Sequence, residues 1–69
     1  MIELHTLSRD SVPFHVNPDL IERIEAVPDT HIWMVTGSKL AVTETVEEVA
    51  AAIRKYRVDI LARALLLAK

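Results

Sequence analysis

The hydrophobic positions of the chain follow two different periods. Up to residue 44, apolar and polar residues alternate in short runs, which is typical of β-strands with one buried face. From residue 45 onward, apolar residues recur every three or four positions, which is typical of a helix. The sequence therefore predicts an α+β fold, in which a small antiparallel sheet of four to five strands (1–44) precedes one long C-terminal helix (45–69). We expect 1–69 to form a single domain, because the chain is too short for two.

Two strands around a polar turn form the first predicted hairpin. The preferred register places Leu4 opposite Val16, which gathers the apolar side chains of both strands on one face. The same register places His5 opposite His15 on the other face. Pro13 has no amide hydrogen to donate, so we expect the second strand to begin there or to lie at an edge.

The segment 18–26 fits two structures. Asn17 and Pro18 are favoured at the start of a helix, and the apolar residues that follow fit helical and strand spacing equally well. We interpret the segment as one helical turn, 18–21, followed by a strand, 22–27.

The second predicted hairpin surrounds the only glycine of the chain, Gly37. Glycine adopts the positive φ that a tight hairpin turn needs. Two registers fit the sequence: a two-residue loop would place Trp33 opposite Leu40, and a three-residue loop would place Met34 there. Trp33 is accordingly either a core residue or a contact for a partner.

The helix 45–69 has a clear start signal. Thr45 and Glu48 form a capping box, in which each side chain accepts a hydrogen bond from the other residue's backbone amide. No Gly or Pro interrupts the segment, which would be about 37 Å long if fully helical. This length exceeds the width of a small sheet, so we expect the C-terminal part of the helix to protrude.

Composition adds a reason to expect a partner. The chain has 69 residues, of which 51% are hydrophobic, and it has no Cys, so no disulfide can stabilise its small core. We therefore expect spare apolar surface to be covered, most simply in a homo-oligomer. The predicted interface residues lie in the second hairpin and the helix tail: Trp33, Val35, Ile60, Leu61, Leu65 and Leu67.

The sequence contains no pattern typical of an enzyme, a cofactor site or a metal site. The three His residues lack metal-ligand spacing, and the serines lie in turns without a nucleophile motif. We therefore expect no catalytic, cofactor-binding or metal-binding residues. No apolar run is long enough to span a bilayer and the first residues do not resemble a signal peptide, so we expect a cytoplasmic protein.

The charge distribution leaves two alternatives open. The net charge of −2 is not typical of nucleic-acid binding, so we expect no nucleic-acid partner. A small nucleic-acid-binding regulator is nevertheless the alternative function, because the helix carries several basic residues: Arg54, Lys55, Arg57 and Arg63. The leucines near the end of the helix also fit a helix that lies on a membrane surface.

Several motifs occur in a fixed order along the chain. They are Met1–Leu4, Phe14–Glu22, Ile24-Glu25, Pro28–Ile32, the turn at Gly37, Val42–Val49 and Tyr56-Arg57. Together they cover nearly the whole predicted domain and resemble the FlbD family of small flagellar proteins, also called SwrD-like. The resemblance implies a cytoplasmic, non-enzymatic accessory factor that supports motor function or swarming near the flagellar base. Its partners would be flagellar motor, stator or assembly proteins.

The chain departs from the family pattern at three places. The family's tight Asn-Gly turn after the first strand is replaced by the longer Ser8–Ser11. Two positions that are usually small and polar hold Trp33 and Val35, and the tail beyond Arg57 is more apolar than the family pattern. The latter two changes add apolar surface, which fits a larger interface in this chain.

Overall fold

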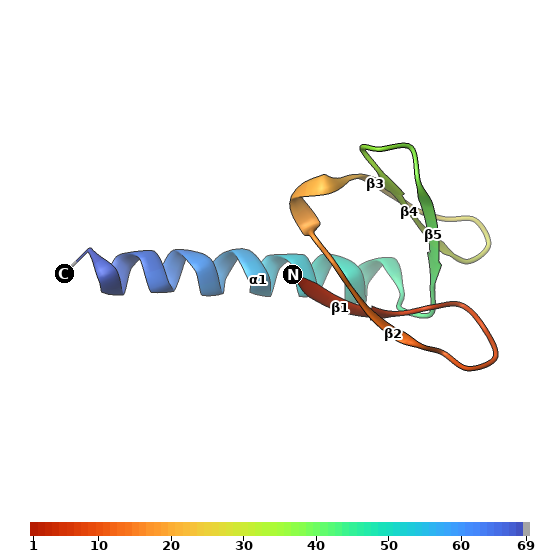
Figure 1. Cartoon of the computed structure of the whole chain (residues 1–69), viewed down its shortest axis with the longest axis horizontal. Coiled ribbons are helices and arrows are strands. Elements are labelled where there is room, and N and C mark those ends of the chain that lie inside the picture. Colours follow the sequence, from red (N-terminus) through yellow and green to blue (C-terminus); the bar gives the residue numbers. More distant parts are fainter. Residues whose placement is uncertain (69) are drawn as a thin grey trace.

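The computed structural model describes residues 1–68 and combines short strands with one long helix (Figure 1). In chain order the elements are β1 (Ile2–His5), β2 (Pro13–Val16), the 3₁₀ helix η1 (Pro18–Leu20), β3 (Ile21–Ala26), β4 (Thr30–Met34), β5 (Lys39–Val42) and α1 (Val46–Leu67). This arrangement confirms the predicted α+β fold. The predicted helix 45–69 is observed as α1, and its last residue, Lys69, lies outside the described residues.

The strands divide into two antiparallel sheets. β1 pairs with β2, while β3, β4 and β5 form a three-stranded sheet in that order. The two sheets meet just after β1, where Thr6 forms a bridge with Val42 of β5. The Leu7 amide also donates to the Ala41 carbonyl at 3.0 Å. The sheets are therefore joined at the β1–β5 edge, which brings both of them against the helix.

The register of the first hairpin corrects the sequence-based prediction. Val16 lies opposite Ile2 and not opposite Leu4. In the predicted register Ile2 would extend past the end of β2, whereas the observed register pairs and buries it. Because side chains alternate between faces, this two-residue shift keeps the same face apolar. It does separate His5 from His15, so the expected cross-strand histidine pair does not form.

The hairpin around Gly37 has a register that differs from both alternatives. Trp33 lies opposite Lys39, so Leu40 faces neither Trp33 nor Met34. The Met34 amide donates at 2.8 Å to the Ser38 carbonyl, so the loop consists of the three residues 35–37. It begins one position earlier than expected. Gly37 itself has a φ of 95°, the positive value expected of this turn.

Both elements interpreted from the ambiguous segment 18–26 are present. The Asn17 side chain caps η1 by accepting a hydrogen bond from the Asp19 amide at 3.0 Å, and Pro18 occupies the first position of the turn. β3 follows directly and begins at Ile21. The helical turn followed by a strand is thereby confirmed, with the strand one residue earlier than predicted.

The core lies between the two sheets and the N-terminal half of α1. Its buried apolar residues come from four strands and the helix: Ile2, Leu4, Val16, Ile32, Met34, Val42 and Val49. The predicted capping box starts the helix, since the Glu48 amide donates to Thr45 Oγ1 at 3.0 Å and the Thr45 amide donates to Glu48 Oε1 at 3.1 Å. Val49, one turn further on, is fully buried and attaches the helix to the core.

Candidate interaction surfaces

The C-terminal half of α1 extends past both sheets, as its length predicts (Figure 1). The molecule is 46 Å long but only 24 × 18 Å across. Tyr56 is the last helix residue that packs against the core. We define the tail surface as the large apolar side chains beyond it: Val58, Ile60, Leu61, Leu65, Leu66 and Leu67. Their exposed fractions run from 50% to 87%, so the sheets leave all of them open to solvent.

The tail surface surrounds the helix and does not form a single stripe. Each residue turns the helix by about 100°, so Ile60 and Leu67 continue the side that faces the core, while Leu61 and Leu65 lie on the opposite side. The only charged residues between positions 58 and 68 are Asp59 and Arg63. A helix that is apolar on all sides is typical of a buried position. A helix on a membrane surface would instead present one strongly polar face.

A second surface lies on the three-stranded sheet, on the face turned away from the core. The side chains of β4 alternate, so Ile32 and Met34 enter the core and Trp33 points outward, where it is half-buried. Arg23 Cζ lies 4.8 Å from the centre of the Trp33 ring, and Lys39 Nζ lies 5.0 Å from it. A cation over an aromatic face is attracted to the ring. We call Trp33, Arg23 and Lys39 the Trp33 cluster.

The predicted interface residues therefore belong to two separate surfaces. Trp33 lies in its cluster and Val35, which is 56% exposed, lies in the loop after β4. The other predicted residues lie on the tail surface, which Figure 1 places at the opposite end of the molecule from β4. Within residues 1–68, Trp33 Nε1 is buried and makes no hydrogen bond, although buried indole N–H groups normally donate one.

Glu44 joins β1 to the start of the helix. Its carboxylate accepts two hydrogen bonds from His5, one from the backbone amide at 3.0 Å and one from imidazole Nδ1 at 2.6 Å. Burial raises the pKa of Glu44, but the hydrogen bonds from His5 outweigh this effect and hold that pKa below its ordinary value of 4.5. The contact joins β1 to the residue that precedes the helix cap, Thr45. Sequence reasoning missed it, because the two residues are 39 positions apart and share no motif.

A groove of about 260 Å³ lies where the start of β1 meets the middle of α1. Apolar and charged side chains both line it: Met1, Ile2, Glu3, Ala52, Lys55, Tyr56 and Asp59. The groove and the tail adjoin along α1, because Asp59 both lines the groove and is the first charged residue of the tail segment.

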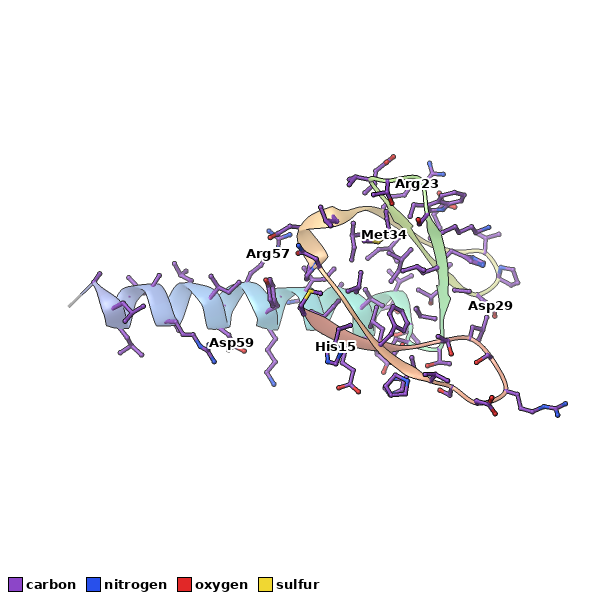
Figure 2. The ribbon with its side chains drawn as sticks, viewed as in Figure 1. His15, Arg23, Asp29, Met34, Arg57 and Asp59 are labelled. Atoms are coloured by element: carbon purple, nitrogen blue, oxygen red, sulfur yellow. The ribbon has the colours of Figure 1, made fainter. Side chains whose placement is uncertain are left out.

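The basic residues of α1 point to different sides of the helix. Arg57 lies 3.9 Å from Asp19 of η1, and Figure 2 shows Arg57 and Asp59 on opposite sides of the ribbon. Arg54 and Lys55 are consecutive residues, so they are about 100° apart around the helix. The positive charge is therefore spread around α1 and does not form one strip along it.

Two kinds of site are absent from the described part of the chain. Residues 1–68 hold no group of three or more His, Asp or Glu side chains that could bind a metal ion. Among the same residues, no helix is long and apolar enough to cross a membrane.

These features define a small α+β protein with a protruding apolar helix. Residues 1–61 match the FlbD family, described as flagellar and swarming motility proteins. The match covers most of the 69 residues, so the chain belongs to the FlbD family. The match ends inside the tail, and Leu65, Leu66 and Leu67 lie beyond it. Comparison with curated proteins and with solved structures finds no match.

Proposed function

We propose that this chain is a non-enzymatic accessory protein of flagellar motility that acts in the cytoplasm as a homo-oligomeric interaction module. The observation that carries the proposal is the tail surface, a set of large apolar side chains that α1 holds beyond the reach of its own sheets. Monomeric soluble proteins rarely expose contiguous apolar patches larger than a few hundred Å². A helix of this kind is expected to be covered by other chains.

The free energy available from the tail surface is comparable with the cost of association. Burying a large apolar side chain contributes about 1.5–3 kcal/mol. With the present exposed fractions, complete burial of all six tail-surface side chains would contribute roughly 6–12 kcal/mol. Association costs roughly 4–15 kcal/mol in lost motion and ordering. The two ranges overlap, so contacts through the tail support a weak to moderate complex, and a well-fitted partner surface would strengthen it.

Two separate surfaces fit a module that contacts both its own copies and the flagellum. Contacts between copies through the tail leave the Trp33 cluster, at the other end of the molecule, free for a flagellar motor, stator or assembly protein. Trp and Arg are enriched among the residues that dominate protein–protein binding. The role of the cluster in binding such a protein stays a prediction from the sequence.

A nucleic-acid-binding role receives less support. Phosphate binding depends on several positive charges that act together, whereas the basic residues of α1 point to different sides and Arg57 lies beside Asp19. A gel shift with RNA or DNA at low salt would detect such binding, and we expect none.

Deletion and complementation test the proposal in a motile bacterium that encodes the chain. We expect deletion to reduce swarming, swimming speed or motor torque, and the wild-type gene to restore them. A Leu67→Asp variant should restore less, because a charge at this position of the tail surface opposes its burial. Val27→Asp is the matched control: Val27 is 75% exposed in the turn between β3 and β4, far from the tail. Unchanged motility in the deletion strain would reject the proposal.

A further inference from the structure

We infer that two copies of the chain pair through antiparallel α1 tails, so that the tail end of each copy occupies the groove of the other. The inference rests on the proposed homo-oligomer and deepens it, because it names the occupant of the groove and the direction of the two helices. Each copy carries both the groove and the segment that fills the groove of the other copy. The same contact therefore forms twice, and the result is a closed dimer with twofold symmetry.

The groove and one side of the tail lie along the same stripe of α1. Ala52, Tyr56 and Asp59 line the groove. Steps of four and three residues continue this stripe to Arg63 and Leu66, which is the spacing of helices that pack side by side. A second helix that lies along the stripe therefore contacts the tail of one copy and enters its groove without changing direction.

The two charges on this stripe select the antiparallel arrangement. In a parallel pair, Asp59 would face the partner's Asp59, and Arg63 would face the partner's Arg63, so like charges would repel on both levels. In an antiparallel pair, the twofold axis can lie midway between positions 59 and 63. Asp59 of each copy then faces the partner's Arg63, so two opposite-charge pairs form. Asp59 and Arg63 are the only charged residues between positions 58 and 68, so they determine the charge match of the tails.

The same alignment brings an apolar end to an apolar groove. With the axis at the level of residue 61, Leu66 lies level with the partner's Tyr56 and Leu67 with the partner's Lys55. Leu66 is 70% exposed and Leu67 is 87% exposed, and the apolar residues Met1, Ile2 and Ala52 line the groove together with Tyr56. Leu61 lies on the opposite side of the helix and takes no part in this contact.

Charge reversal tests the pairing by sedimentation equilibrium of the full chain. Asp59→Arg and Arg63→Asp should each weaken the dimer by about tenfold or more, because like charges then face each other across the axis. An equal mixture of the two variants should pair as well as the wild type, since an all-acidic stripe then faces an all-basic one. The mixture separates contacts between chains from contacts within a helix, because neither variant regains an opposite-charge pair within its own helix.

Each outcome has a distinct meaning. Loss in both single variants and recovery in the mixture support the antiparallel pair. A dimeric wild type whose single variants pair equally well overturns this geometry and leaves the homo-oligomer standing. A wild type that stays monomeric overturns both the pair and the homo-oligomer, while the motility assay decides the flagellar role separately.

Disulfide trapping measures the direction of the helices independently. The chain has no Cys, so single cysteines can be placed freely. Lys55→Cys mixed with Leu66→Cys should give a disulfide-linked heterodimer under oxidation. Neither variant should link to itself, because identical positions in the antiparallel pair are roughly 15–18 Å apart along the axis, while a disulfide needs Cα atoms within about 7 Å. Self-linking without the mixed product would indicate a parallel pair and reject the inference.

Discussion

Replacing Glu44 by Ala should destabilise the fold by removing the contact between β1 and the start of α1. Two hydrogen bonds from His5 are lost, at 3.0 Å and 2.6 Å. Hydrogen bonds to charged groups contribute about 1.5–3 kcal/mol each. The His5 side chain is 40% exposed, so hydrogen bonds to water replace part of this stabilisation when the carboxylate is removed. We therefore expect a loss of about 2–3 kcal/mol. A chain of this size has a total stability of roughly 3–10 kcal/mol, so the loss is large.

Urea denaturation followed by circular dichroism at pH 7 measures this loss. The matched control is Glu22→Ala, which removes an exposed carboxylate from β3 and should change the free energy of unfolding by less than about 0.5 kcal/mol. Equal midpoints for the wild type and Glu44→Ala would refute the reasoning, because His5 and the helix start would then be positioned without this carboxylate.

The dependence on pH has a definite sign. The pKa of Glu44 is lower in the folded protein than its ordinary value of 4.5, so its contribution to stability is complete above pH 4.5 and is lost as the pH falls through the folded value. The difference in unfolding free energy between the wild type and Glu44→Gln should therefore shrink as the pH falls below 4.5. A difference that grows in acid would contradict the assignment.

Three further substitutions test the fold by the same denaturation assay. Val49→Ala should cost about 2–3 kcal/mol, because it leaves a cavity at a fully buried position; a cost under about 0.5 kcal/mol would mean that the helix is not attached there. Thr45→Ala should cost about 1 kcal/mol through loss of the helix cap, and Thr45→Ser should retain most of that stability. Gly37→Ala should cost about 1 kcal/mol through backbone strain alone, since φ is 95° and an added Cβ would meet nothing within 4 Å; unchanged stability would contradict the positive φ.

The helix and its protrusion could be predicted from the sequence because their causes are local. The capping box fixed the start at Thr45, and helix length alone indicated that the tail outruns a small sheet. Ordered motifs also indicated the family over residues 1–57, and the family match extends to residue 61. Which tail residues contact another chain was predicted from exposure and spacing, and it stays a prediction.

The hairpin registers could not be predicted, because alternation repeats every two residues. A shift by two positions keeps every side chain on its face, so the pattern around Leu4 and Val16 fits both the predicted and the observed pairing. The Trp33 cluster depends on such a register, since Arg23 and Lys39 reach the ring only when both lie opposite Trp33 on the neighbouring strands. The conformation of each connecting loop decides which residues pair, and the alternation of apolar residues does not determine that conformation.

The tail of α1 is the proposed contact between copies, and sedimentation equilibrium measures whether it holds them together. We predict that the wild type has twice the chain mass of 7.8 kDa at concentrations where Leu67→Asp is monomeric, because that substitution places a carboxylate in an apolar contact that would remove it from water. Leu61→Asp, on the opposite side of the helix, should keep the dimer. A wild-type mass of 7.8 kDa at every concentration, or an unchanged mass in Leu67→Asp, would contradict the account.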